Sequence, residues 1–97
     1  MTEPRPTATT ITLRALEGEP LRDERIRDMV IAAAHALAER NGVVVVDLQA
    51  EPDRIVFTLL ADRLVAMGFA AELRRITTAW YTGKFGLETL WGEPGHD

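Results

Sequence analysis

The fold of this chain is decided by residues 43–57, which read VVVVDLQAEPDRIVF. The run of four valines favours a β-strand, and the Pro-Asp pair that follows it is a turn signal. In the segment after the turn, successive side chains point to opposite faces, so Ile55 and Phe57 lie on one face and Arg54 and Val56 on the other. The stretch therefore predicts a β-hairpin with one buried face.

The segments on either side of this hairpin predict the element order β-α-β-β-α-β. Polar and apolar residues alternate over residues 10–16, as they do in a strand with one buried face. Apolar residues follow helical spacing over residues 21–40, and the Asn-Gly pair after them is a helix stop signal. A second helix, capped by Asp62, is expected to end near Tyr81. The strands are expected at residues 10–16, 43–48, 54–60 and 87–91.

Two helices packed on one face of a four-stranded antiparallel sheet form a ferredoxin-like α+β sandwich. We expect a single domain over residues 9–91, a flexible N-terminal arm at residues 1–8 and a polar tail at residues 92–97. The other face of the sheet is then left open by the chain itself. The residues expected on this open face include Thr12, Arg14, Arg54, Val56 and Thr58. An uncovered sheet face is typical of a surface that meets a partner, so function is sought there.

The composition excludes several classes of chemistry. The 97 residues contain no cysteine, which excludes disulfides and cysteine-ligated metals. No apolar run is long enough to span a bilayer and no secretory signal opens the chain, so we expect a cytoplasmic protein without a membrane partner. No glycine-rich nucleotide-binding motif occurs, and we expect neither a cofactor nor a bound metal.

The charge is uneven along the chain. The net charge is −4, with eleven basic and fifteen acidic side chains. Residues 54–91, however, carry five basic and three acidic side chains. This imbalance favours either a weakly basic face in the second half of the chain or an ordinary solvated surface.

Several short sequences, in their order and spacing, point to one family. Residues 51–60 read EPDRIVFTLL, residues 73–80 read LRRITTAW, and Leu90-Trp91 follow after a short loop. Together with the first predicted strand and helix they resemble the HUH single-tyrosine transposases of the insertion-sequence and REP-associated type. In that family the hairpin carries a Pro-Asp-His-x-His motif. Here Arg54 and Val56 stand where the two histidines would be, and the resemblance covers roughly residues 9–97.

The resemblance implies that this chain lacks the family's chemistry. In the family, the two histidines and a further polar ligand hold Mg²⁺ or Mn²⁺, and a tyrosine on a later helix attacks the scissile phosphate. An arginine is always protonated and a valine has no donor atom, so neither Arg54 nor Val56 can replace a histidine as ligand. Tyr81, the only tyrosine, falls within the second predicted helix and does not match the nucleophile. We therefore expect no enzymatic activity.

The first function that stays open is that of an inactive transposase-like domain that binds structured or single-stranded DNA through its open sheet face. Two guanidinium groups, those of Arg14 and Arg54, would bind phosphate there if the first and third strands are neighbours. The alternative for Arg54 is a solvated side chain that faces Asp47 or Glu51 across the hairpin. The candidate nucleic-acid-binding residues are Arg14, Arg54, Arg74, Arg75 and Lys84.

Two other functions are alternatives. One is a homodimeric protein-interaction module that pairs through the exposed sheet, using Val56 and neighbouring valines, with no role for nucleic acid. The other is a small enzyme that holds a divalent metal with Asp47, Glu51 and Asp53, although turn chemistry explains Asp53 equally well. The acidic composition and the missing ligands favour a non-enzymatic module, and both non-enzymatic functions are compatible with a homodimer.

Overall fold

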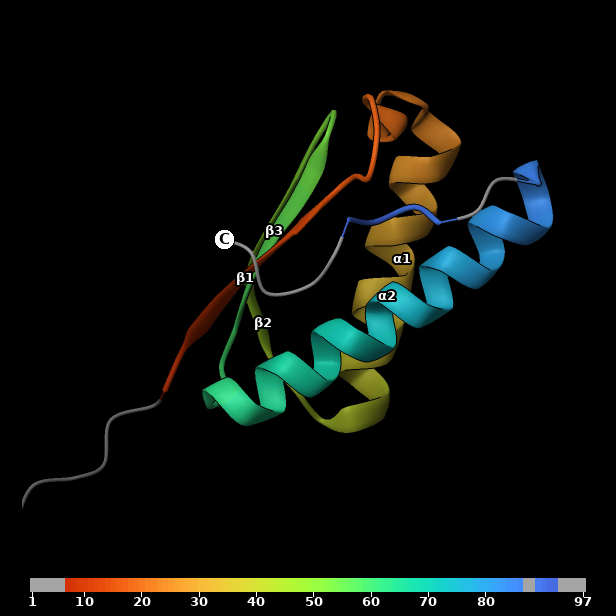
Figure 1. Ribbon diagram of the computed structural model, residues 1–97. Coiled ribbons are helices and arrows are strands. Elements are labelled where there is room, and N and C mark those ends of the chain that lie inside the picture. Colours follow the sequence, from red (N-terminus) through yellow and green to blue (C-terminus); the bar gives the residue numbers. More distant parts are fainter. Residues whose placement is uncertain (1–6, 87–88, 93–97) are drawn as a thin grey trace, which may run out of the picture.

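Three antiparallel strands form a sheet in the order β1-β3-β2, and two helices lie against one face of it (Figure 1). The computed structural model describes residues 7–86 and 89–92. Its strands are β1 (Thr9–Arg14), β2 (Val45–Glu51) and β3 (Arg54–Leu59), and its helices are the short 3₁₀ turn η1 (Pro20–Arg22), α1 (Glu24–Asn41) and α2 (Arg63–Phe85). The predicted α+β class is confirmed.

Strand β3 is the centre of the sheet. It pairs with β1 on one side and with β2 on the other, antiparallel in both cases. The predicted hairpin joins β2 to β3, with Glu51 opposite Arg54 at the turn. Farther from the turn, a bulge between Val45 and Asp47 shifts the register of the pair. The bulge adds one residue to β2, which changes the face to which the following side chains point.

Helix α1 begins later than its apolar pattern predicts. Pro20 opens the 3₁₀ turn η1, and Leu21 is buried there, with 1% of its surface exposed. The α-helix starts only after Asp23, whose Oδ1 accepts the Arg25 N–H at 2.9 Å and so caps the first turn. Leu21, at which the helix was predicted to begin, therefore belongs to the core but not to the helix.

The other end of α1 explains the late start of β2. The helix ends at Gly42, which adopts the left-handed conformation with φ of 65°, as the predicted stop signal requires. The N–H of Val43 then donates to the Ala38 carbonyl at 2.9 Å. Because Val43 is still engaged in closing the helix, the strand predicted from residue 43 begins at Val45.

Helix α2 has the predicted cap and is one turn longer than predicted. Asp62 Oδ1 accepts the N–H of Val65 at 2.9 Å. The helix continues past Tyr81 to Phe85, because the first left-handed residue is Gly86, with φ of 69°. Among the helices of the described residues, none has the length and the apolar character that a membrane span requires.

The predicted fourth strand is present only as a bridge within the described part of the chain. Ala15, just after β1, forms an antiparallel bridge with Trp91, and the Leu16 N–H donates to the Leu90 carbonyl at 3.0 Å. The rest of the predicted strand includes residues 87–88, which lie outside the described ranges. The segment thus covers one end of the outer edge of β1.

One hydrophobic core fills the space between the sheet and the two helices. The inward side chains of β3 are 0–1% exposed, as their predicted alternation requires. Trp91 is also 1% exposed and is the largest fully buried side chain. The helical part of the core comprises Ile26, Val30, Ala34, Leu37 and Ala38 from α1 and Ala66, Phe69, Ala70 and Leu73 from α2.

A buried hydrogen bond connects Trp91 to helix α2. The Trp91 Nε1–H donates to Thr77 Oγ1 at 2.8 Å, and the Thr77 hydroxyl donates to the Leu73 carbonyl at 2.6 Å. Thr77 is completely buried. The threonine hydroxyl therefore accepts a hydrogen bond from the only polar atom of the indole ring. It donates its own proton to a backbone carbonyl of the helix.

We expect Thr77→Val to destabilise the fold. The change preserves the shape and the β-branching of the side chain but leaves the buried indole N–H without an acceptor, which costs about 1–3 kcal/mol. The matched control is Thr78→Val on the same helix, because the Thr78 hydroxyl is 3.4 Å from that of half-buried Thr89. Urea unfolding of both variants measures the difference, and equal losses in the two would contradict the assigned role of Thr77.

Candidate functional site: the open face and the free edge of the sheet

The uncovered face of the sheet is polar. Along β3 it carries Arg54, Val56 and Thr58, and the register places one residue of β1 and one of β2 beside each of them. The resulting rows are Thr10–Thr58–Asp47, Thr12–Val56–Gln49 and Arg14–Arg54–Glu51. Val56 is thus an isolated apolar side chain with a threonine and a glutamine beside it. This pattern is typical of a sheet face that meets water.

Arg14 and Arg54 are direct neighbours across β1 and β3, as predicted for adjacent strands. Arg54 is held by the residue before it: its Nε lies 3.0 Å from Asp53 Oδ1 and its Nη2 lies 3.2 Å from Asp53 Oδ2. These hydrogen bonds lower the pKa of Asp53, and the charges of Arg54 and Arg14 lower it further. Arg54 thus forms an ion pair with Asp53, in the turn itself.

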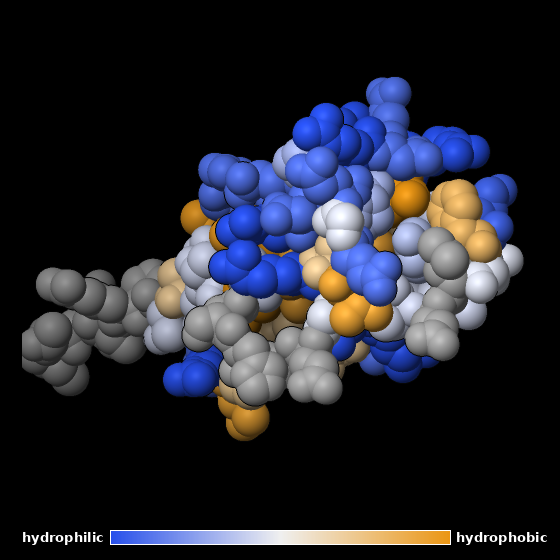
Figure 2. Space-filling view, turned by 45° about the horizontal axis from the view of Figure 1, so that its top comes forward, coloured by the Kyte–Doolittle hydropathy of each residue, from blue (hydrophilic) through white to orange (hydrophobic). Residues whose placement is uncertain are grey.

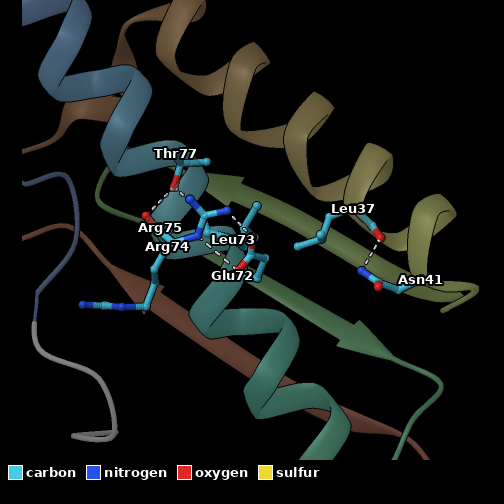
Figure 3. Close-up of polar contacts among 7 residues, drawn as sticks. All are labelled: Leu37, Asn41, Glu72, Leu73, Arg74, Arg75 and Thr77. Atoms are coloured by element: carbon cyan, nitrogen blue, oxygen red, sulfur yellow. Dashed lines mark hydrogen bonds and ion pairs between the residues drawn. The ribbon is translucent and has the colours of Figure 1, made fainter.

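The remaining candidate basic residues lie on α2, in the helical layer of the molecule. Arg75 forms an ion pair with Glu72 one turn earlier, whereas Arg74 extends away from that pair (Figure 3). Partial burial lowers the pKa of Arg74. Lys84 is exposed in the last turn of the helix. The structure therefore brings Arg14 and Arg54 together but separates them from the three basic residues of α2.

The candidate metal ligands do not assemble into a site. Within residues 7–86 and 89–92, no three histidine, aspartate or glutamate side chains come together in an arrangement that could hold a metal ion. Asp53, one of the three carboxylates proposed as ligands, is bound to Arg54. Tyr81 packs against Phe85 with ring centroids 5.4 Å apart, on the aromatic end of α2.

A feature that sequence reasoning missed is the free edge of β2. Within the described residues β2 pairs only with β3, so its outer edge presents backbone N–H and C=O groups that no other described strand pairs. Val44, just before β2, and Val46, within it, are 56% and 58% exposed. The signal was present in the sequence, because four consecutive valines in a strand cannot all face the core.

Further exposed apolar side chains lie between the end of β3 and the first turns of α2. The N–H of Leu60 donates to the Val44 carbonyl at 2.9 Å, which places the end of β3 beside the start of β2. Helix α2 begins three residues later, and Leu64 in its first turn is 81% exposed. On the face shown in Figure 2, hydrophobic residues appear as separate orange areas in a mainly hydrophilic surface. Leu16, Leu60, Val65 and Met67 are also among the exposed apolar side chains.

A shallow groove of about 520 Å³ separates the end of α1 from the first half of α2. Leu37, Val65 and Phe69 line its floor together with Gly68, and Arg40, Asn41 and Glu72 add polar groups. The Asn41 side chain is tied to its own helix, since its Nδ2 donates to the Leu37 carbonyl at 2.9 Å (Figure 3). The groove is open to solvent and lacks the convergent polar groups that fix a small ligand.

Comparison with known proteins adds no further assignment. The chain matches no protein-family model, and no curated protein is significantly similar to it. The resemblance to HUH transposases therefore stays a prediction.

We expect Arg54→Gln to raise the pKa of Asp53, because the carboxylate loses the hydrogen bonds that stabilise its charged form. A carboxyl with a depressed pKa in the folded state contributes stability above its unfolded pKa, and this stability is lost as the pH falls through the folded pKa. The difference in unfolding free energy between wild type and Arg54→Gln should accordingly shrink as the solution is acidified below the ordinary range of an aspartate.

Side-chain carboxyl titration by NMR measures this pKa directly, and urea unfolding over the same pH range measures the stability. The matched control is Arg75→Gln, which removes the corresponding partner of Glu72, whose pKa is lowered mainly by Arg75. It should raise the pKa of Glu72 and leave that of Asp53 unchanged. A pKa of Asp53 that does not respond to Arg54→Gln would contradict the ion-pair assignment.

Proposed function

We propose that this chain is a non-catalytic, ferredoxin-like protein-interaction module that functions as a homodimer. The observation that carries the proposal is the coincidence of a free strand edge with exposed apolar side chains, Val44 just before β2 and Val46 within it. An exposed edge strand is a template for pairing with another chain, and apolar burial beside it adds the driving force.

The ferredoxin-like arrangement is supported by the strand order. The sheet order β1-β3-β2 and the crossover from β1 through α1 to β2 are those of a split β-α-β fold. The bridge between Ala15 and Trp91 adds chain on the outer side of β1, where the fourth strand of that fold belongs. In such a sheet β2 is one of the two edge strands.

The absence of catalysis is proposed from the residues at the centre of the open face. Arg54 and Val56 occupy the positions that the transposase resemblance gives to metal ligands. Arg54 is half-buried and bound to Asp53, while Val56 lies between Thr12 and Gln49. Neither side chain offers a lone pair for a cation or a proton-transfer group that titrates near neutral pH.

For this function we expect the wild-type protein to form dimers in a concentration-dependent manner, with little effect of moderate salt, because apolar burial and backbone pairing dominate. Val46→Lys should weaken the dimer at least about tenfold, or ~1.4 kcal/mol, since a charge at a strand edge opposes pairing. Sedimentation equilibrium measures the dissociation constant.

The control for this experiment is Leu64→Lys, which replaces an even more exposed apolar residue with the same charge on α2. It should leave the dissociation constant nearly unchanged. Loss of the dimer in Leu64→Lys alone would move the interface from the strand edge to α2. A wild-type protein that stays monomeric at all concentrations would refute the proposed function.

A second candidate function is the binding of structured or single-stranded DNA at the end of the open face. The specific observation in its favour is the direct juxtaposition of Arg14 and Arg54. It is weaker than the first because Asp53 binds Arg54 and because Arg74, Arg75 and Lys84 belong to another layer. Phosphate binding at this place would have to compete with the Asp53 carboxylate.

For the second function we expect a labelled DNA hairpin to bind at about 50 mM salt and to dissociate strongly by about 200 mM, because phosphate contacts release counterions. Arg54→Ala should weaken this binding, whereas Arg75→Ala should not, since Arg75 is paired with Glu72 on α2. Fluorescence anisotropy provides the measurement. Equal effects of the two substitutions, or no binding at the lower salt concentration, would exclude the Arg14–Arg54 site.

A further inference from the structure

Strand β2 differs on its two faces, and both faces are incompletely covered. Leu48 and Ala50 lie opposite core residues of β3, so their side chains face the helices, and both are only half-buried. Asp47, Gln49 and Glu51 alternate with them, point to the open face and are exposed. A strand that extends the sheet beyond β2 would therefore meet apolar side chains on one face and carboxylates on the other.

The bulge limits the part of the edge that another strand can extend. It falls between Val45 and Asp47, and a bulge locally disrupts the ladder of the strand that contains it. From Asp47 to Glu51, in contrast, each residue of β2 has one partner on β3. The outward N–H and C=O groups then recur at every second residue, as in a regular antiparallel pair. The regular part of the edge is thus the part that carries the carboxylates.

These two carboxylates are not neutralised by their neighbours. Among the ion pairs formed within residues 7–86 and 89–92, none includes Asp47 or Glu51. Arg54 lies opposite Glu51 but is bound by Asp53. Asp47 contacts an uncharged group, since Gln49 Nε2 lies 3.4 Å from its Oδ2. The open-face side of the β2 edge therefore carries negative charge that a partner can complement.

The edge strands of a second copy do not complement this charge. Strand β2 reads VVDLQAE and contains no basic residue, so two β2 edges bring like charges together, which is destabilising. Strand β1, the other edge strand, reads TTITLR and has its single basic residue at its last position. A second copy is consequently a weaker occupant of the β2 edge than a strand that alternates basic and apolar residues.

We propose that the preferred partner at the β2 edge is an extended basic segment of another protein, which adds a strand beside Asp47–Glu51 and displaces the second copy. Its basic side chains lie beside Asp47 and Glu51 on the open face. The apolar side chains between them cover the exposed parts of Leu48 and Ala50 on the helix side. This inference rests on the proposed function for the place of contact and specifies the partner.

Charge provides the specificity of this contact. When a strand is added to a sheet edge, main-chain hydrogen bonds provide affinity for any extended chain, and the alternating side chains select among chains. The carboxylates of β2 oppose a second copy or an acidic strand and attract a basic one, so the same residues act for one partner and against the others.

Three labelled peptides test the partner in fluorescence anisotropy at about 50 mM salt, where screening is moderate. The first alternates, Thr-Lys-Val-Lys-Val-Lys-Thr. The second has glutamate in place of each lysine. The third has the composition of the first but groups its lysines, Thr-Lys-Lys-Lys-Val-Val-Thr. We expect the alternating lysine peptide to bind, the glutamate peptide not to bind, and the grouped peptide to bind more weakly because it cannot match both faces of β2 at once.

Removal of the edge charge should have opposite effects on the two partners. In the double variant Asp47→Asn/Glu51→Gln, the alternating lysine peptide should bind at least about fivefold more weakly, because two ion pairs are lost. The homodimer should become tighter, since the repulsion between its two edges is removed. The matched control is Glu17→Gln/Glu39→Gln, which changes the net charge equally at exposed positions outside β2 and should alter neither constant.

Hydrogen exchange locates the bound peptide. Addition of the alternating lysine peptide should slow the exchange of outward backbone N–H groups in β2 and leave those of β1 unchanged, because only the β2 edge gains hydrogen-bond partners. Binding of the peptide without protection of β2 would contradict strand addition. Equal binding by wild type and Asp47→Asn/Glu51→Gln would contradict the role of the carboxylates.

The outcomes separate this inference from the function on which it rests. A protein that dimerises but binds none of the peptides, or all three equally, refutes the basic partner and leaves the homodimer standing. A protein that sediments as a monomer at all concentrations, yet binds the alternating lysine peptide with protection of β2, refutes the homodimer and supports the basic partner. A protein that does neither refutes both.

Discussion

The two-sided pairing of β3 is the constraint on which the rest of the structure depends. Ile55, Phe57 and Leu59 are 0–1% exposed beneath the helices, and the residues between them face the opposite way. A slip of one residue would turn Arg54 toward the core, where an unsatisfied charge is far more costly than a lost apolar contact. Since β1 and β2 both pair with this strand, its register decides which of their side chains reach the open face.

Several charges of the described residues are balanced by a neighbour close in the sequence. Arg54 is bound by Asp53, Arg75 by Glu72, and Arg25 by Asp23, within one to three residues in each case. Exposed pairs of this kind contribute little stability, but they reduce the positive potential available to a polyanion. The open face presents threonines and a glutamine at its centre. The exposed apolar residues lie at the edge and end of the sheet. This distribution is the reason why we propose a protein partner and not DNA.

The local features of the fold were predictable because their causes lie within a few residues. The Asp62 cap, the stop at Gly42, the turn between β2 and β3 and the two faces of β3 were all predicted correctly. The errors concern boundaries where two elements compete for the same residues. Val43 completes α1 before β2 begins, and Leu21 is buried in a 3₁₀ turn that imitates helical spacing. Of the candidate site, the proximity of Arg14 and Arg54 was predicted, whereas the free edge of β2 was not.

The sequence by itself determined the order of the elements, the faces of the central strand and the identity of residues 54 and 56, which carry no metal-ligating atom. These properties follow from periodicity, capping and side-chain chemistry, which act over short stretches of chain. Only the tertiary structure decided that the basic residues separate into two layers, that Trp91 is held by Thr77, and that β2 is left as an edge. Strand order and burial arise from contacts between distant segments, and the free energy of these contacts depends on the packing of the whole core.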